Sequence, residues 1–303
     1  MRVAIAGGSG FIGQALTKAL LERNNEVIII SRHKAGHAAH EKLQFITWTE
    51  LAANHEQLED IDAVINLAGE SINQRWTAKA KQRIAQSRLW SAAQLAGLFG
   101  MLETPPPLVI NASGISAYGD VALNPCDENS PTADNDFLSK VVRSWEQAAD
   151  AIPAQRLIKL RIGVVLSLKG GAFPLMALPY RLFGGGRIGK GTQGISWIHL
   201  DDLVRLIIFC LEQPGISGVV NASAPEPVAN DQFGRAIGRA MKRPHWLPVP
   251  APAFRLLLGE MADLLLTGQR AVPRKALEHG FQFLYPTVDS AMQQLFKSKQ
   301  RIN

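Results

Sequence analysis

The stretch that decides the fold is Arg2-Val3-Ala4-Ile5-Ala6, followed by Gly7-Gly8-Ser9-Gly10-Phe11-Ile12-Gly13. Residues 2–6 predict a buried strand, and residues 11–23 carry apolar side chains at helical spacing. The glycines between them satisfy both G-x-x-G-x-x-G and G-x-G-x-x-G. A backbone without side chains can turn sharply and approach a pyrophosphate group at the helix N-terminus. We therefore predict a dinucleotide-binding turn, with contacts from Gly7, Ser9, Gly10, Phe11, Ile12 and Gly13.

The end of the second predicted strand, Val27–Ile30, distinguishes between two dinucleotides. A site for NAD has an acidic residue there, which binds the ribose hydroxyls. This chain instead has Ser31-Arg32-His33-Lys34. A hydroxyl and cationic groups favour the 2′-phosphate of NADP(H) through charge-assisted hydrogen bonds. The alternative is a basic loop that only contacts solvent.

Strands and helices alternate through the first half of the chain, which predicts an α/β fold with a Rossmann-type, doubly wound parallel sheet. We expect the NADP-binding domain at residues 1–165, with the chain returning to it at about 201–224. A smaller α+β substrate domain is expected within 166–303. Expected strands are Arg2–Ala6, Val27–Ile30, Phe45–Thr47, Ala63–Leu67, Leu108–Ala112 and Leu157–Leu166; expected helices are Phe11–Arg23, Thr77–Met101, Ser139–Ala151, Asp202–Glu212, Asn230–Met241 and Ala253–Leu266.

Composition narrows the class of protein. Of 303 residues 47% are hydrophobic, yet no apolar run reaches the roughly 20 residues that span a bilayer. Glycines interrupt any signal-peptide core near the N-terminus. Cys126 and Cys210 form no C-x-x-C pair, which excludes a disulfide framework and a cysteine-based zinc site. We expect a cytoplasmic protein with a small-molecule substrate and without a membrane or nucleic-acid partner; the sequence leaves its oligomeric state open.

A metal site is not expected either. His33, His37 and His40 have helical spacing, but neither a carboxylate nor a cysteine completes a ligand set beside them. H-E-x-x-H is absent, and Ser9 has no nucleophile-elbow context. The sequence therefore does not support a hydrolase or a metalloenzyme.

Charge is distributed unevenly along the chain. Residues 151–303 contain 19 Lys and Arg against 9 Asp and Glu. Arg187 and Lys190 lie in a glycine-rich segment that can become ordered when a ligand binds. We expect them to favour an anionic substrate, with Trp197 as an apolar wall. The alternative is that these cations are merely solvated.

Further motifs carry a family resemblance. Asn66-Leu67-Ala68-Gly69, and Ser113 followed by Tyr118-Gly119, resemble the extended short-chain dehydrogenase/reductase superfamily. The motifs INLAGES (65–71), SWIHLDDL (196–203), GEMA (259–262) and GQR (268–270) are similar to the SDR39U1-type epimerase family. This resemblance spans nearly the whole chain. It implies an NADP-binding Rossmann domain with a small C-terminal domain, but no particular activity. Our leading hypothesis for the activity is hydride transfer or epimerisation on a small carbonyl or sugar-like substrate.

The resemblance also implies positions around the cofactor. Leu67, Ala68 and Gly69 would lie along its ribose and pyrophosphate, and Val165 near its nicotinamide. Arg83 and Arg88, five residues apart on one predicted helix, would reach a phosphate. The alternative for the two arginines is an ordinary surface helix face.

The catalytic pair of the superfamily, a Tyr with a Lys four residues later, is absent. Ala122 follows Tyr118 at that spacing, and residues 136–142 read DFLSKVV. One hypothesis is an enzyme with another proton donor, with Tyr118 (assisted by Ser113), Lys140, Glu70 and His199 as candidates. The other is a protein that binds NADP(H) without turnover, as a redox-sensing or interaction module.

Overall fold

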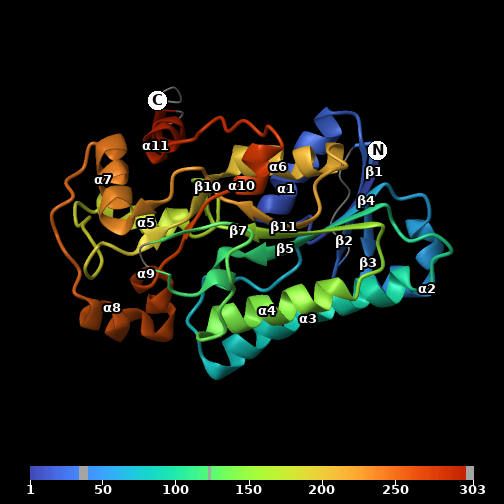
Figure 1. Ribbon diagram of the computed structural model, residues 1–303, viewed down its shortest axis with the longest axis horizontal. Coiled ribbons are helices and arrows are strands. Elements are labelled where there is room, and N and C mark those ends of the chain that lie inside the picture. The colour runs from blue at the N-terminus through green and yellow to red at the C-terminus, as the bar shows by residue number, and fades with distance from the viewer. Residues whose placement is uncertain (34–39, 122–123, 298–303) are drawn as a thin grey trace.

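The computed structural model describes residues 1–33, 40–121 and 124–297. Its centre is a seven-stranded parallel sheet (Figure 1). The strand order is that of a doubly wound Rossmann fold, which confirms the predicted fold class. From one edge to the other, the strands are β11 (Gly218–Ala222), β7 (Arg156–Ile162), β5 (Leu108–Gly114), β4 (Ala63–Asn66), β1 (Arg2–Ala6), β2 (Glu26–Ser31) and β3 (Leu43–Thr47).

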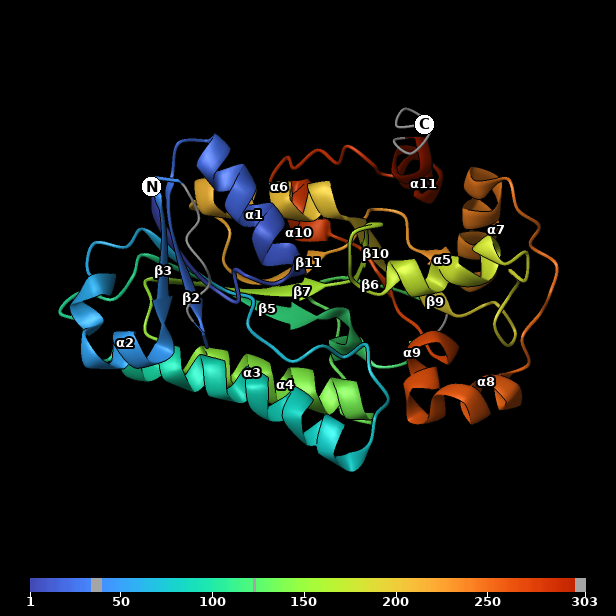
Figure 2. The same ribbon diagram turned by 180° about the vertical axis from the view of Figure 1, so that it is seen from behind.

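Helices cover both faces of this sheet, and alternate residues of each strand supply the two cores. Val3 and Ile5 of β1 face one core, and Ala4 and Ala6 face the other. Figures 1 and 2 show α1, α6 and α10 over the first face and α3 and α4 side by side over the second. Burial on both faces explains why these strands are almost continuously apolar. The helices are α1 (Phe11–Glu22), α6 (Leu200–Glu212) and α10 (Arg274–Glu278) on one side, and α2 (Trp48–Ala53), α3 (Ala78–Phe99) and α4 (Phe137–Asp150) on the other.

Residues 166–197 and 224–296 form a second region, which has its own core around Phe173, Trp197 and Phe233. After the strand β8 (Val164–Leu166) and the start of the second region, the chain returns to the large sheet. There α6 packs beside α1, and β11 pairs with β7. Whether residues 1–165 and 166–303 are separate domains stays a prediction. The remaining elements are β6 (Pro125–Cys126), β8 (Val164–Leu166), α5 (Phe173–Arg181), β9 (Gly194–Ile195), β10 (Trp197–His199), β12 (Val228–Ala229), α7 (Asn230–Met241), α8 (Ala251–Leu258), α9 (Asp263–Leu266), β13 (Arg270–Ala271) and α11 (Val288–Lys297), with short 3-10 turns at His55–Leu58, Ile115–Tyr118 and Gly259–Ala262.

Two predicted elements are wrong in extent, and both errors lie at a glycine. The predicted strand Leu157–Leu166 is two strands, because β7 ends at Ile162 and β8 pairs with β10. A Cβ at Gly163 would lie 2.7 Å from the Ser196 oxygen, so only glycine allows this crossing. The predicted helix Ala253–Leu266 is interrupted at Gly259, whose φ of 61° ends α8.

None of the described helices combines the length and the apolar character needed to cross a membrane.

Candidate functional site

The glycine-rich turn brings β1, α1 and the segment after β4 into backbone contact. Gly7 has φ of 78°, and a Cβ on it would lie 2.9 Å from the backbone of Ala68. A Cβ on Gly13 would lie 2.5 Å from the Cα of Gly8. Only glycine fits both positions, and Gly10 leads directly into the free N–H groups of α1. The turn therefore forms a cradle that fits the pyrophosphate of a dinucleotide.

The segment after β4 forms the opposite wall and is fixed by α3. The backbone N–H of Glu70 donates to Ser87 Oγ at 2.8 Å. The Glu70 carboxylate accepts hydrogen bonds from Gln74 (3.2 Å) and Arg83 (3.4 Å). Leu67 and Ala68 are half-buried and Gly69 is exposed. Sequence reasoning did not assign Ser87 this role, because its partner is a backbone atom 17 residues away.

Arg88 has less freedom than expected for a phosphate ligand. Its Nη1 donates to the carbonyl oxygens of Glu70 (3.0 Å) and Ile84 (2.9 Å). Its guanidinium also lies over the ring of Trp145, 5.0 Å from the centroid. Burial lowers the pKa of Arg88 to about 10, against a smaller opposite effect of Glu70. The side chain supports the wall that carries Gly69, and Arg83 is the more exposed of the two arginines.

The end of β2 presents the residues expected to bind a 2′-phosphate. Ser31 is half-buried, and its hydroxyl donates to the His33 carbonyl oxygen at 2.5 Å. Arg32 is exposed and makes neither an ion pair nor a hydrogen bond to the described residues. A guanidinium without a partner among the described residues is available to an incoming phosphate.

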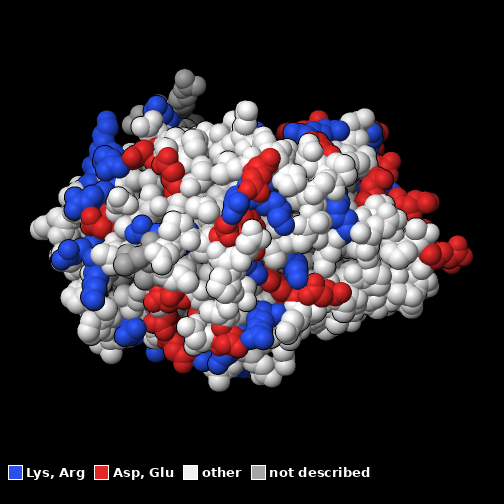
Figure 3. All heavy atoms as spheres, viewed as in Figure 1, with Lys and Arg blue, Asp and Glu red and all other residues white. Residues whose placement is uncertain are grey.

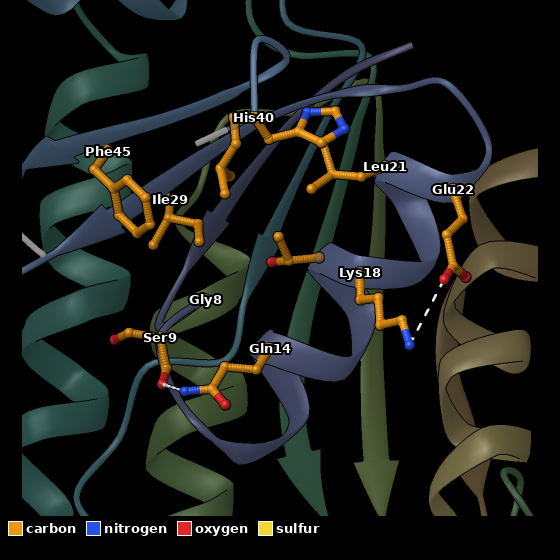
Figure 4. A pocket seen from close by; sticks show the side chains of 11 residues that line it. Gly8, Ser9, Gln14, Lys18, Leu21, Glu22, Ile29, His40 and Phe45 are labelled. Carbon is orange, nitrogen blue, oxygen red and sulfur yellow. Dashed lines mark hydrogen bonds and ion pairs between the residues drawn. The ribbon is translucent and has the colours of Figure 1, made fainter. Parts of the chain in front are cut away.

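A cavity of about 500 Å³ adjoins the turn between α1 and the strands β2 and β3 (Figure 4). Gly8, Ser9 and Gln14 line one end, and Gln14 donates to the Ser9 carbonyl oxygen at 2.8 Å. Ile29 and Phe45 line the rest, together with both polar and apolar side chains: Thr17, Lys18, Leu21, Glu22, His40 and Leu43. The cavity thus begins at the phosphate turn and continues away from the carboxyl ends of the other strands.

The segment that follows Val165 approaches Phe11 at the start of α1. Val165 is half-buried in β8, which runs parallel to β10. A Cβ on Gly170 would lie 2.6 Å from the Phe11 ring, so the chain after β8 approaches the start of α1 closely. Phe11 and Ile12 are half-buried at this contact.

Ser113 and Tyr118, the two expected catalytic residues, belong instead to a buried polar network. Ser113 Oγ donates to Glu146 at 2.6 Å, and Arg161 binds both Glu146 oxygens at 2.7 and 2.8 Å. Tyr118 is 1% exposed, lies under the Arg161 guanidinium and donates to Asn221 Oδ1 at 2.8 Å. Burial raises the pKa of Tyr118 to about 12. Both hydroxyl groups thus have partners inside the protein, and the assignment of these two residues to proton transfer stays a prediction.

Apolar side chains occupy the start of α4, where the missing catalytic pair was expected. The Phe137 ring packs edge-on against Trp76, with centroids 5.1 Å apart. Lys81 lies 5.5 Å from the centroid of the same ring. Lys140 is exposed on the next part of the helix and makes no side-chain contact with a described polar group. Sequence reasoning missed the Trp76–Phe137 pair, since the two residues are distant in the chain.

His199 has a structural role. It is 2% exposed, its Nδ1 accepts the Asp201 backbone N–H at 3.1 Å at the start of α6, and its Nε2 lies 3.0 Å from Gln294. Burial lowers its pKa, although Asp201 acts in the opposite direction. His199 is therefore the N-cap of α6.

The three residues expected to contact the substrate differ in exposure: Trp197 is buried, whereas Arg187 and Lys190 are exposed. Trp197 is fully buried and donates to the Glu226 carbonyl oxygen at 3.1 Å. It packs in the core of the second region, and its role as an apolar wall stays a prediction. Arg187 and Lys190 are exposed and have no ionic partner within the described ranges.

Among the described residues, no group of three or more His, Cys, Asp or Glu is arranged to hold a metal ion. His37, one of the three closely spaced histidines, lies outside the described residues.

Comparison with known proteins places this site in a family. The model of the NAD dependent epimerase/dehydratase family matches residues 3–222, and a domain of unknown function (DUF1731) matches residues 249–295. The chain is 41% identical to the epimerase family protein YfhF of Bacillus subtilis over 305 residues, covering 100% of both chains. It is 36% identical to an epimerase family protein of Staphylococcus epidermidis, covering 98% of this chain and 99% of the other.

A solved structure agrees with these relatives over nearly the full length. The human epimerase family protein SDR39U1 (isoform 2), solved with NADPH, superposes with a TM-score of 0.90 at 37% identity. The match covers 98% of this chain and 99% of the human one. With the parallel sheet and the glycine cradle described above, these matches show that the chain belongs to the NAD dependent epimerase/dehydratase family, as an SDR39U1-type member.

Proposed function

We propose that this protein binds NADP(H) in preference to NAD(H) and reduces or epimerises a small carbonyl or sugar-like substrate. The observation that carries the cofactor assignment is the combination of the glycine cradle with an exposed Arg32, in place of an acidic residue, at the end of β2. The NADPH in the human relative supports it. Gly7, Gly10 and Gly13 would hold the pyrophosphate, and Ser31 and Arg32 the 2′-phosphate.

Calorimetry tests the preference directly. We expect wild-type protein to bind NADPH more tightly than NADH, because a charge-assisted phosphate contact contributes about 1.5–3 kcal/mol. Arg32→Ala should narrow the difference at least about tenfold. Arg23→Ala, which removes an exposed cation elsewhere on the surface, is the matched control and should leave the preference unchanged. Equal affinities of wild type for the two dinucleotides would contradict the assignment.

The proton donor must come from a residue outside the missing Tyr-Lys pair. When bound, NADPH supplies a hydride to a carbonyl carbon. Of the candidates, Tyr118 and His199 are buried in internal hydrogen bonds, whereas the Glu70 carboxyl is partly exposed beside Ala68. In this sheet the carboxyl ends of the strands are where ligands bind. We assign Glu70 the role of proton donor: its protonated carboxyl would give a proton to the carbonyl oxygen, and Gln74 and Arg83 would stabilise the carboxylate that is left.

A substrate screen with matched variants tests this role. Oxidation of NADPH is followed with small aldehydes, ketones and nucleotide sugars. Glu70→Gln should keep NADPH affinity and lose about a hundredfold or more in turnover. Lys140→Gln is the control and should keep turnover, and full activity of the Glu70 variant would assign the proton to another group.

The burial of Tyr118 and the Phe137 ring at the start of α4 favour a second function, NADP(H) binding without turnover. The protein would then act as a redox-sensing or interaction module. The same screen separates the two: wild-type protein that binds NADPH but turns over none of these substrates supports the binding function.

Arg187 and Lys190 support an anionic or phosphate-bearing substrate, because both are exposed cations beside the glycine-rich loop. Replacing both with Ala should weaken substrate or product binding and spare NADPH. Hydrogen exchange at residues 184–194 should slow when such a ligand binds, and exchange that is unchanged with every anionic ligand would contradict this role.

A further inference from the structure

One end of the second region carries apolar side chains on its surface. Leu182 is 72% exposed and Trp246 is 67% exposed, and Phe183 and Leu247 are also exposed. The two pairs are 63 residues apart in sequence but adjacent in space, because Trp246 Nε1 donates to the Phe183 carbonyl oxygen at 2.8 Å. We call these four residues, with Arg181, Lys242 and Arg243, the edge patch. Soluble proteins seldom expose such a cluster without a partner.

The backbone at this patch is held in a conformation that its side chains disfavour. Phe183 has φ of 60° directly after α5, and Lys242 has φ of 55° directly after α7. Glycine is the usual residue where a helix ends in the left-handed region, because a Cβ costs free energy there. Strained residues of this kind gather where a side chain has a function. Here the strained positions present an exposed aromatic ring and an exposed cation.

Buried hydrogen bonds fix the two segments relative to each other. Tyr180 Oη lies 2.8 Å from His245 Nδ1, and His245 Nε2 lies 2.9 Å from Asp231. Tyr180 precedes Leu182 and Phe183, and His245 immediately precedes Trp246. The backbone N–H groups of Trp246 and Leu247 both donate to the Gly185 oxygen. The apolar side chains are therefore displayed on a rigid support, which reduces the entropy lost on binding.

The patch is positively charged. Arg181, Lys242 and Arg243 make no ion pair within the described chain, and the Arg243 guanidinium lies 4.2 Å from the Phe183 ring centroid. Asp231 faces Arg187 and Gly191 nearby, but it is paired with Arg235 and His245. Figure 3 shows Lys and Arg gathered along the left edge, over α7 and the segment that leads from it to α8.

We propose that the edge patch docks the protein on an anionic phospholipid surface, with Trp246, Phe183 and the two leucines entering the interface. Protein surfaces that bind at the membrane interface combine exposed Trp, Phe and Leu with Lys and Arg. The expectation of no membrane partner rested on the lack of a spanning segment, and a surface contact requires none. This inference is independent of the proposed function.

The shape of the patch favours lipid over a protein partner. The anchors of a protein interface insert into pockets and pair with anchors on the other chain. The cavities of about 500 and 120 Å³ are lined by residues outside the edge patch. The segments after α5 and α7 that carry the patch lie at one end of the elongated molecule (Figure 1), and an end of the molecule can meet a flat surface.

Co-sedimentation of the full chain with vesicles tests the proposal. We expect binding to vesicles of equimolar phosphatidylcholine and phosphatidylglycerol, and at least about tenfold weaker binding to phosphatidylcholine alone. Phe183→Gly should weaken binding to the anionic vesicles about tenfold, since it removes a ring that is half-exposed in the free protein. Because glycine suits the backbone at this position, the variant should melt at the same or a higher temperature, so lost binding cannot be attributed to unfolding.

Matched variants separate the patch from the rest of the surface. Leu284→Ala removes an apolar side chain of similar exposure elsewhere and should bind as wild type does. Arg181→Gln with Arg243→Gln should weaken binding to anionic vesicles, whereas Lys18→Gln with Arg23→Gln removes the same charge on α1 and should have a smaller effect.

Three results would overturn the proposal. The first is that wild-type protein binds neither kind of vesicle. The second is vesicle binding that Phe183→Gly and Leu284→Ala leave equally strong. The third is tighter binding to polyglutamate or to single-stranded oligonucleotide, weakened by Phe183→Gly, which would assign the patch to an acidic macromolecule.

Discussion

The β1–α1 turn and the ends of β5 and β7 lie at the same edge of one sheet, yet they are organised in opposite ways. The turn presents backbone groups to the outside, and its close contacts at Gly7 and Gly13 are possible because side chains are absent. At the ends of β5 and β7, polar side chains turn inward, and Ser113, Glu146 and Arg161 bind one another. The cofactor-binding part of the family fold is kept, whereas the usual catalytic part holds structural hydrogen bonds.

This difference separates ligand binding from stability in the two regions. A change in the turn should act mainly on cofactor affinity, and a change in the buried network mainly on folding. Four predictions test that separation, and a fifth concerns the backbone directly after α7.

The largest effect is expected for Glu146→Gln. It leaves the buried Arg161 guanidinium without a counter-charge, and breaking a buried ion pair in this way costs about 3–5 kcal/mol of unfolding free energy. Urea unfolding measures the loss. Arg143→Gln, which breaks an exposed pair with Asp134 near the same helix, is the control and should cost less than about 1 kcal/mol. Similar losses in the two variants would show that the network is not the stabilising feature.

The Glu146 carboxylate should also make the unfolding free energy of the protein fall at low pH. Burial by itself raises the pKa of Glu146, but hydrogen bonds from Arg161 and Ser113 outweigh it and lower the pKa. A lowered folded-state pKa adds stability above the unfolded value of about 4.3, and this stability is lost as the pH falls through the folded pKa. Unfolding curves at successive pH values should therefore show wild type losing stability below about pH 4.3, and Glu146→Gln losing less. If wild type and Glu146→Gln lose stability equally as the pH falls, Glu146 is not the group responsible.

Gly7→Ala changes the turn, and we expect its main effect on cofactor affinity. The new Cβ meets the Ala68 backbone at a positive φ, which costs about 1–3 kcal/mol and moves the cradle apart. NADPH affinity measured by calorimetry should fall at least about tenfold. Gly97→Ala is a control in α3, where a Cβ meets nothing within 4 Å; it should gain about 0.5–1 kcal/mol and bind NADPH normally. Unchanged NADPH affinity in the Gly7 variant would place the pyrophosphate elsewhere.

Tyr118→Phe should cost about 1–2 kcal/mol, because Asn221 Oδ1 loses its donor in a buried place. NADPH affinity and any turnover should stay as in wild type. Loss of turnover with unchanged stability would mean that the hydroxyl reaches the substrate in another conformation, and would return Tyr118 to catalysis.

The smallest effect is a gain. Lys242→Gly should raise the unfolding free energy by about 0.5–1 kcal/mol, since glycine removes the cost of a Cβ at φ of 55°. Lys242→Ala keeps that cost and is the matched comparison. If both variants melt alike, the backbone after α7 is not strained.

Much of the fold was predictable because its signals are local. Apolar runs predicted six of the seven strands of the sheet, and the glycine spacing predicted the turn between β1 and α1. The edge strand β11 was not predicted as a strand. The errors at Gly163 and Gly259 arose because a glycine inside an apolar pattern does not reveal whether the chain bends. Contact with the distant Ser196 backbone decides the first of these, and no sequence window contains it.

The site was predictable only in part, for a similar reason. The identities of Gly7–Gly13, Ser31 and Arg32 are sufficient to predict a dinucleotide turn, because backbone geometry and charge at neighbouring positions produce it. The direction in which a polar side chain points depends on what the fold brings near it. Ser113 and Tyr118 have residue types that suit catalysis, but Glu146, Arg161 and Asn221 engage them. Likewise only packing reveals that Trp197 is core, and only packing joins Phe183 to Trp246 in one surface patch. Local sequence thus determined the sheet and the cradle, whereas contacts across tens to a hundred residues decided which side chains remain available for chemistry.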